Sequence, residues 1–331
     1  MNVTLGVPRL KEIINAAKHI STPIITAKLE RDDNKVAARL VKATIEKTTL
    51  GEVAKYFKEV YSPEQCYISV KLDMDAIEQL KLNVDAYTVR HAILHGTRGQ
   101  TRNAVMRSLC ETNVLIKRGS KSKFRVIVPD MKVGGTSSSG LGKTPTYFCM
   151  QMLKEALPNV IVQGVPTVKR AVIHESNTDD SGNPIYNLLM EGYGLQEVIG
   201  SPGIDGLNTT TNHVLEVEEV LGVEAARAQI SAEIDNIMKA YGIGIDNRHL
   251  LLLSDVMTFK GEVLGITRFG VSKMRESVLM LASFEKTTDH LFDAAVHGRT
   301  DAIVGVSECI VMGMNVRVGT GAPSLFWKRQ T

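Results

Sequence analysis

The sequence lacks the cysteine pattern of a metal clip or a disulfide-stapled domain. Its four cysteines are far apart, and no two of them have the close spacing that zinc clips use. We interpret them as reduced thiols that pack as small apolar groups, and they are Cys66, Cys110, Cys149 and Cys309. The sequence therefore predicts neither a structural zinc site nor a disulfide framework.

Long apolar runs are lacking as well. No stretch is long enough to span a bilayer. The first residues also have no basic head followed by an apolar segment, which a secretory signal would need. From the sequence we expect a soluble chain that is not secreted.

Clustered carboxylates, which two-metal nucleotidyl transfer needs, are also lacking. The closest spacing of aspartates is at Asp73 and Asp75, where a helix cap is the simpler use. No His-Glu-x-x-His pattern occurs, and serine, histidine and aspartate are too frequent for a triad to be inferred without geometry. The sequence predicts no catalytic residue and no metal site in this chain.

What the sequence does contain is the composition of an ordinary folded protein. Of its 331 residues, 44% are hydrophobic and 23% are charged, which argues against wholesale disorder. This length is typical of about two or three domains. The net charge of +3 does not exclude nucleic acid as a partner, because a basic patch can be local.

Hydrophobic periodicity predicts an α+β fold with segregated strands. A helix starts near Pro8 and is stopped at residues 21–23, and Thr49 and Glu52 match a capping box. Strands are predicted at 24–29, 66–72, 114–116, 124–128, 160–162, 171–173 and 187–189. Helices are predicted at 36–45, 73–82, 84–95, 214–241, 248–257 and 272–295. The chain is therefore expected to become mainly helical after about residue 213.

A run of glycine and serine at 134–140 is the clearest loop or boundary in the chain. It continues into Gly140, Gly142, Lys143 and Thr144, which end like a phosphate-binding P-loop. The first glycine of that motif is replaced by Ser137, so its backbone cannot wrap a phosphate in the same way. A solvated linker is favoured, and a nucleotide-binding protein of this kind is the alternative.

Two basic stretches are candidates for contacts with nucleic-acid phosphates. One is a predicted hairpin with a basic tip, and the other is a glycine-bounded turn that begins a helix. The residues concerned are Lys117, Arg118, Lys121 and Lys123 in the first, and Arg268, Lys273 and Arg275 in the second. From composition alone, a solvated surface explains the first stretch equally well, and it is favoured over a phosphate contact for the second.

Several longer segments are more distinctive than their composition. They are NVTLGVPRLKEIIN at 2–15, VQGVP at 162–166, RAVIH at 170–174, VLGVEAAR at 220–227, RHLLLLSDVMT at 248–258, KGEVLGITRFG at 260–270, ESVLMLASFEKT at 276–287, GVSEC at 305–309 and VGTG at 318–321. In this order they resemble the C-terminal part of the largest subunit of cellular DNA-directed RNA polymerases. The segments from 260 to 287 resemble polymerase III rather than polymerase II. The resemblance covers nearly the whole chain and is weakest from about 61 to 158.

The resemblance implies that the bond-forming chemistry lies outside this chain. The aspartate triad that holds Mg²⁺, the bridge helix and the trigger-loop histidine would all precede residue 1, so the chain would bind no cofactor and would be inactive alone. Four parts are implied: the trigger-loop C-terminal helix and a first cleft segment at 1–45, a jaw at 46–157, cleft strands and helices with a switch segment at 158–280, and the clamp-core terminus at 281–331.

The resemblance also assigns roles to residues. The trigger-loop helix would run over 7–19, with Gly6, Val7, Pro8 and Arg9 as its hinge and start. Template-strand phosphates would be met by Arg268 first, then Lys273 and Arg275. Downstream DNA would lie along Lys117, Arg118, Lys121 and Lys123.

The implied partners are the rest of the largest subunit, the second-largest subunit, the smaller polymerase subunits, and template and downstream DNA. The implied location is the nucleus. A polymerase II-like segment and the C-terminal piece of a divided archaeal largest subunit are the alternatives within the family.

Overall fold

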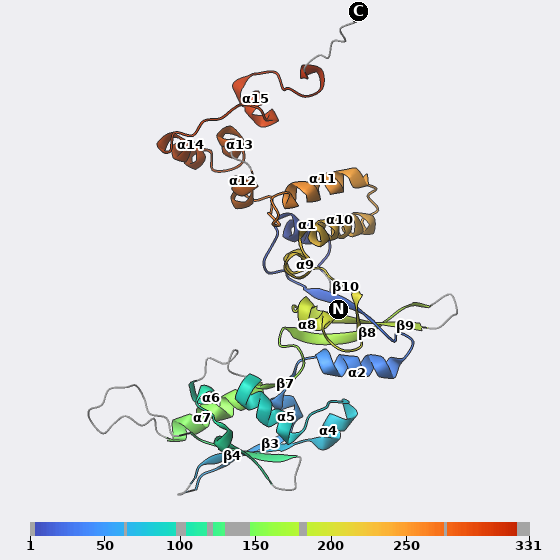
Figure 1. Ribbon diagram of the computed structural model, residues 1–331, viewed down its shortest axis with the longest axis vertical. Coiled ribbons are helices and arrows are strands. Elements are labelled where there is room, and N and C mark those ends of the chain that lie inside the picture. The colour runs from blue at the N-terminus through green and yellow to red at the C-terminus, as the bar shows by residue number, and fades with distance from the viewer. Residues whose placement is uncertain are drawn as a thin grey trace, which may run out of the picture. The chain divides into compact units, whose positions relative to one another are not determined.

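The structure, a computed structural model, describes residues 4–62, 65–96, 104–117, 122–129, 146–178, 184–274 and 277–322 (Figure 1). The chain divides into two compact units. The central unit is the continuous stretch Pro23–Thr211, and the composite unit joins Met1–Thr22 to Asn212–Thr331. Helices and antiparallel sheets occur together, so the predicted α+β class is confirmed.

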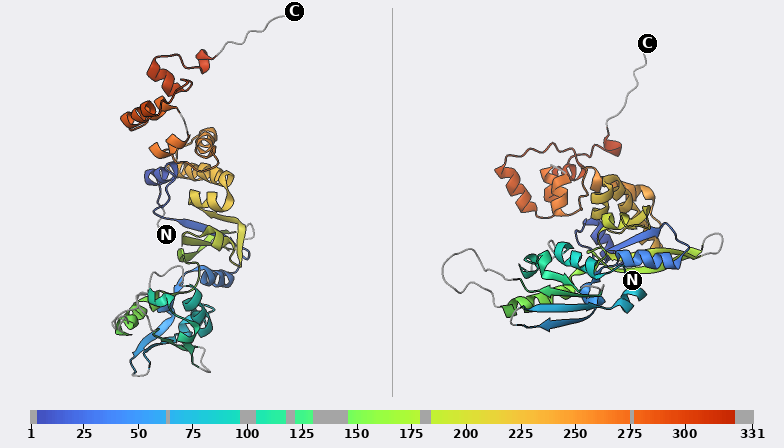
Figure 2. Two further views of the ribbon diagram at one scale, coloured as in Figure 1. Left: turned by 60° about the vertical axis from the view of Figure 1, so that its left-hand side comes forward. Right: turned by 60° about the horizontal axis from the view of Figure 1, so that its bottom comes forward.

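The first sheet of the central unit has four antiparallel strands in the order β10-β1-β9-β8. They are β1 (Ile24–Leu29), β8 (Val168–Thr178), β9 (Pro184–Gly192) and β10 (Ile204–Thr211), with the short helix α8 (Leu195–Ile199) before β10. Ile25 and Ala27 of the inner strand β1 are fully buried, as expected for a β-branched segment between two neighbours. Helix α2 (Lys35–Ile45) follows β1 and lies along β8 and β9 (Figure 2).

The second sheet of the central unit has the order β3-β4-β6-β5. Its strands are β3 (Ala54–Val60), β4 (Tyr67–Leu72), β5 (Val114–Ile116) and β6 (Lys123–Ile127). Ile68 and Val70 of β4 and Phe124 and Val126 of β6 are fully buried, and the residues between them face outward. The strict alternation of the sequence therefore gives this sheet one apolar and one polar face.

Short helices cover the apolar face of the second sheet. They are α3 (Leu50–Val53), α4 (Met74–Gln79), α5 (Ala86–His91), α6 (Ala104–Arg107) and α7 (Thr146–Ala156), together with the π-helical turn η1 (Ala92–Gly96) and the 3₁₀ turns η2 (Glu111–Asn113) and η3 (Leu157–Asn159). A two-stranded ladder of β2 (Thr48–Thr49) and β7 (Ile161–Gln163) leads back to the first sheet. The predicted capping box is present, because the Glu52 carboxylate accepts from the Thr49 N–H at 3.0 Å.

The regular elements among the described residues of the composite unit are all helices. Its helices are α1 (Val7–Ile14), α9 (Val214–Leu221), α10 (Val223–Ala240), α11 (Asn247–Thr258), α12 (Arg268–Met274), α13 (Val278–Ser283), α14 (Thr287–Val296) and α15 (Val306–Met312), followed by the 3₁₀ turn η4 (Gly319–Gly321). Helix α10 packs against α1, α9 and α11, and it buries Ile230, Ile234 and Ile237 (Figure 1). The N-terminal helix is thus part of a core built by a segment two hundred residues away.

Three predicted helix boundaries were wrong. The first helix ends at Ile14 rather than at residue 19, because Ala16 adopts a left-handed φ of 47° and the Ala17 N–H bonds back to the Glu12 carbonyl. The helix predicted over 214–241 is divided at Gly222, whose φ is 94°. The helix predicted over 272–295 is interrupted before α14 by Glu285 and Lys286, which both have positive φ.

The strands predicted from period-two patterns are confirmed as β1, β4, β5, β6, β7, β8 and β9, with ends shifted by a few residues. The glycine and serine run at 134–140 and the P-loop-like residues up to Thr144 lie outside the described residues. The four-part division with boundaries after 45, 157 and 280 concerns function rather than packing, and it stays a prediction.

Candidate hinge and nucleic-acid interface

Arg9 is a buried cation at the start of α1, with only 3% of its surface exposed. Its guanidinium donates to Glu12 Oε2 at 3.0 Å, to Glu233 Oε2 of α10 at 3.3 Å, and to the backbone carbonyl of Asn212, which precedes α9. A buried charge is tolerated only when it is paired and hydrogen-bonded in this way. Arg9 therefore ties the N-terminal helix to two helices that are distant in sequence.

The two carboxylates around Arg9 differ in their protonation behaviour. Burial raises the pKa of the Glu12 carboxyl, but hydrogen bonds from the Ser21 N–H and hydroxyl and from Arg9 outweigh it, so its pKa lies below the ordinary value. Burial raises the pKa of the Glu233 carboxyl, and the charge of Arg9 only partly offsets this rise. Glu12 is consequently the firmer counter-ion, and through Ser21 it also holds the segment that follows α1.

His213 caps α9 and fastens the same segment from the other side. Its Nδ1 accepts from the Glu216 N–H at 3.0 Å, and its Nε2 lies 3.2 Å from the Lys18 carbonyl. These two contacts together require a neutral ring with the hydrogen on Nε2. Burial lowers the pKa of His213, Arg9 and His19 lower it further, and the Lys18 carbonyl and Glu216 oppose the shift. The neutral tautomer is therefore part of the fold.

The predicted hinge residues lie together at the N-terminal end of α1. Gly6 has a φ of 81°, and a Cβ at this position would lie 2.2 Å from the Tyr241 hydroxyl, so a side chain would clash. Pro8 occupies the first turn, where its missing N–H leaves no bond unmade. Val7 is 64% exposed, whereas Arg9 is buried. The sequence placed these four residues side by side but did not reveal that Arg9 points inward.

The end of α1 also holds the turn that leads into α12. The Ile266 N–H donates to the Ile14 carbonyl at 2.8 Å. A Cβ on Gly265 would lie 2.3 Å from the Asn15 carbonyl oxygen, and a Cβ on Gly270 would lie 1.9 Å from the Gly265 carbonyl oxygen. Both glycines are needed for these close backbone approaches.

Arg268, the first residue of α12, is exposed, and its guanidinium carbon lies 4.7 Å from the centroid of the exposed Phe269 ring. Lys273 is exposed on the same helix, with its Nζ 3.7 Å from Glu262 Oε1. An exposed pair of this length contributes little to stability, so both cations are accessible to a ligand. Arg275 lies outside the described residues.

The predicted basic hairpin is confirmed as β5 and β6, which pair antiparallel. Lys117 follows β5 and is exposed, and Lys123 is the first residue of β6. Arg118 and Lys121 lie outside the described residues. The described part of this site therefore consists of Lys117, Lys123 and the residues that neighbour Lys123 in the sheet.

The outward side of the second sheet is more basic than the sequence indicated. Lys123 is the ladder partner of Lys71, whose other neighbour is Tyr56 on β3. One step along, Ser69 lies between Arg125 and Lys58 on the two flanking strands. We call the outward side of this sheet the basic sheet face, and its charged and aromatic members are Lys58, Lys71, Lys123, Arg125, Tyr56 and Tyr67. Sequence reasoning missed Lys58 and Lys71, because only the strand register brings them beside Lys123.

The basic sheet face has properties expected of a surface that binds phosphates. Lys71 and Lys123 are like charges directly opposite each other, which costs stability unless an anion is present. The Arg125 guanidinium carbon lies 5.0 Å from the centroid of the Tyr67 ring, a cation–π contact between neighbouring strands. The tyrosines add planar surface between the cations.

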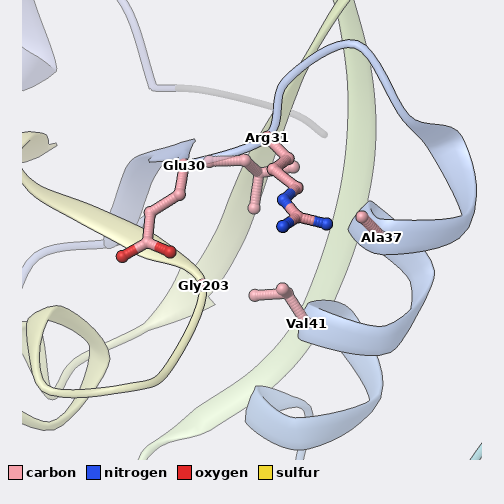
Figure 3. Close-up of a pocket in the computed structure, with 6 residues that line it drawn as sticks. Glu30, Arg31, Ala37, Val41 and Gly203 are labelled. Atoms are coloured by element: carbon pink, nitrogen blue, oxygen red, sulfur yellow. The ribbon is translucent and has the colours of Figure 1, made fainter.

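A small pocket of about 220 Å³ in the central unit offers no comparable set of groups (Figure 3). Its charged side chains are Glu30 and Arg31, which point toward different walls, the guanidinium toward Ala37. Gly203 keeps it open, since a Cβ there would lie 2.7 Å from a methyl group of Val41. Convergent polar groups, which a specific ligand would need, are not provided by these walls.

Potential metal ligands do not cluster among the described residues. In that part of the chain, no three histidine, cysteine, aspartate or glutamate side chains come together as a metal site would require. The donor set for Mg²⁺ is therefore not offered by these residues. Within the same residues, no helix has both the length and the apolar character needed to cross a membrane.

Comparison with known proteins assigns this architecture to a family. Residues 1–279 match the family described as RNA polymerase Rpb1, domain 5, and the chain belongs to that family. It is 51% identical over 328 residues to DNA-directed RNA polymerase III subunit RPC1 of Homo sapiens, covering 99% of this chain and 22% of that protein. It is 48% identical over 325 residues to the Saccharomyces cerevisiae subunit of the same name, covering 97% of this chain and 21% of that protein.

The relatives show both which subunit this chain resembles and how much of that subunit it covers. The resemblance to the C-terminal part of the polymerase III largest subunit is confirmed. The chain spans about a fifth of the length of the curated relatives that it matches. The individual roles of the hinge, switch and jaw residues stay predictions.

Replacing His213 by asparagine will test the neutral cap. Asparagine keeps an N-cap acceptor but does not titrate. In the wild-type chain the folded pKa is depressed, so below about pH 6.5 the unfolded state takes up a proton that the folded state resists, and stability falls. The free energy of unfolding, measured by urea denaturation between about pH 7.5 and 5.5, should fall less in His213→Asn.

The matched control is His249→Asn, which changes an exposed histidine of the same unit. Its pH dependence should match that of the wild-type chain. If the free energy of unfolding falls with pH by the same amount in the two variants, the depressed pKa of His213 does not contribute to the pH dependence of stability.

Proposed function

We propose that this chain is a segment of the largest subunit of DNA-directed RNA polymerase III and takes part in DNA-templated RNA synthesis. The observation that carries the proposal is its 51% identity to human RPC1 along 99% of the chain. The relatives with this name extend far beyond the matched segment, so the activity of the complete subunit is inferred for this chain. Its own contribution is to position nucleic acid and to anchor a moving element.

The moving element is proposed to be the C-terminal arm of the trigger loop, with Gly6, Val7, Pro8 and Arg9 at its hinge. The contacts of Arg9 support this division. Its guanidinium holds the first turn of α1 to α10, whereas the side chain of Val7 is 64% exposed. Gly6 allows the change of backbone direction just ahead of the anchored part. A hinged hairpin requires a fixed helix next to a point where the backbone can change direction, and α1 and Gly6 fit these two requirements.

The nucleic-acid contacts are proposed at two surfaces. Arg268 and Lys273 on α12, with Arg275, would meet phosphates of the template strand near the active centre. The basic sheet face would lie along downstream DNA, and Lys117, Arg118 and Lys121 are further predicted contacts with that DNA. Both contacts are with phosphates, so they are expected to be independent of sequence and sensitive to salt.

The bond-forming step is proposed to lie in polypeptide outside these residues. We expect the Mg²⁺ ions of the complete polymerase to be held there, and among the described residues no three histidine, cysteine, aspartate or glutamate side chains come together that could hold them instead. The partners would be the rest of the largest subunit, the second-largest subunit, smaller subunits and DNA, in the nucleus.

The isolated 331-residue chain should be inactive in nucleotide incorporation on a primed template with Mg²⁺. The reason is that the described residues bring together no cluster of ligands for the two metal ions that transfer requires. The complete polymerase serves as the positive control in the same assay. Robust extension by the isolated chain would contradict the proposed division of labour.

The basic sheet face is tested by the double variant Lys71→Gln/Lys123→Gln. Removing two phosphate contacts should reduce the slope of log K against log salt for duplex DNA by about 2. The matched control is Lys28→Gln/Lys35→Gln, which removes two charges from exposed lysines elsewhere in the central unit. Because the two altered lysines repel each other, the double variant should not be less stable. If the slope of log K against log salt changes equally in the two double variants, the basic sheet face is not a specific phosphate-binding surface.

Arg268 is tested in an assembled polymerase. Arg268→Ala should weaken open-complex stability and reduce its salt slope by about 1, because one phosphate contact is lost. Arg268→Lys should keep most of the slope, since the charge remains. Arg248→Ala, at an exposed position of α11, is the control. A salt slope that is the same in Arg268→Ala and wild type would exclude a phosphate contact at this position.

A further inference from the structure

The central unit contains a hollow of about 530 Å³ to which the proposed function gives no role. Four separate segments line it: the last turns of α2 with the residues that follow it, α3, the end of α4 with the turn after it, and the start of β8. Its cationic lining residues are Arg39, Lys42, Lys47, Lys81 and Lys169. Its acidic lining residues are Glu46 and Glu52. The hollow therefore collects far more positive charge than the near-neutral chain average.

Both carboxylates of the hollow are already engaged. Glu46 Oε2 lies 3.4 Å from Lys42 Nζ, and Glu46 Oε1 accepts from the Ala171 N–H at 3.4 Å. Glu52 accepts from the Thr49 N–H as part of the capping box. Lys42 is thus the cation with an acidic partner. In the part of the chain that the structure describes, the side chains of the other four cations have no hydrogen bond or ion pair.

The walls of the hollow are fixed by backbone contacts rather than by the lysines. The Gln163 side chain donates to the Ala43 carbonyl at 3.1 Å and accepts from the Asn83 N–H at 3.2 Å, so it joins α2 to the chain that follows α4. The Val165 N–H donates to the Ile45 carbonyl at 2.9 Å. The hollow is consequently formed in advance of any ligand, as specific binding sites usually are.

Lys81 occupies a backbone position where a lysine is costly. It follows α4 with a φ of 57°, and the Leu82 N–H bonds back to the Ile77 carbonyl, an ending that favours glycine. A side chain in the left-handed region costs stability that glycine would avoid. An exposed cation kept there at the edge of a basic hollow points to a binding role.

We propose that this hollow binds a compact anion with several phosphate groups, of the class of a nucleoside or inositol polyphosphate. Its volume is in the range of small-molecule sites, and the cations that line it belong to three separate segments of the chain. Duplex DNA needs an extended basic surface instead, which the basic sheet face provides. Leu80, Leu82 and Ala43 add apolar wall against which a ring can lie. The inference goes beyond the proposed function and does not depend on it.

The test is calorimetric titration of the 331-residue chain with inorganic tripolyphosphate at about 150 mM salt, where surface attraction is screened. The variant Lys81→Gln/Lys169→Gln should lose affinity by about tenfold or more, because two phosphate contacts are removed. Lys28→Gln/Lys35→Gln, with the same change of net charge, should stay within about twofold of wild type. Parallel titrations with ATP and inositol hexakisphosphate distinguish a nucleotide from an inositol phosphate as the source of the phosphates.

A second variant separates binding from folding. Lys81→Gly should raise the Tm by about 2 °C or more, since glycine relieves the left-handed backbone, and should still weaken tripolyphosphate binding. Three results would overturn the proposal. The first is that the wild-type chain does not bind tripolyphosphate at this salt, and the second is an equal loss of affinity in the two lysine-pair variants. The third is that Lys81→Gln/Lys169→Gln loses affinity for duplex DNA but not for tripolyphosphate. Weaker binding by a more stable Lys81→Gly chain supports it, because a purely structural lysine would not behave in this way.

Discussion

The composite unit depends on the burial of one cation, the Arg9 guanidinium. It bonds to Glu12 on its own helix, to Glu233 on α10 and to the carbonyl of Asn212. Because an unpaired charge cannot remain in an apolar interior, these groups must arrive together. That requirement brings residues 4–22 back to a core that otherwise begins two hundred residues later. His213 completes the junction by capping α9 and meeting the Lys18 carbonyl.

This junction explains how one short helix can serve a proposed hinge and a proposed nucleic-acid contact. The body of α1 is fixed by Arg9, and its end is fixed by the bond between Ile14 and Ile266. The second bond places the turn that presents Arg268. If the start of α1 moved, it would therefore move against the fixed part of the same helix, and that part also holds the turn that precedes Arg268. Hinges of this kind need a rigid neighbour more than they need flexibility of their own.

Charge in this chain is organised by tertiary structure rather than by composition. The formal net charge is only +3, yet the fold gathers cations on the basic sheet face and around the hollow beside α2. On the basic sheet face, Lys71 and Lys123 lie closer to each other than stability alone would favour. Phosphate groups are the natural counter-ions for both surfaces, one extended and one concave.

The sequence by itself determined the class of fold, the family resemblance and most strands, because period-two patterns and turn residues are local properties. It also placed Gly6 to Arg9 at a helix start and Arg268 at the start of another. Only the tertiary structure decided that α1 stops at Ile14, that Arg9 is buried, and that His213, Glu233, Lys58 and Lys71 belong to the sites. These facts depend on strand register and on contacts between residues far apart in the chain. No local pattern encodes them, since the free energy of burying a charge or pairing a strand is set by partners that arrive from elsewhere.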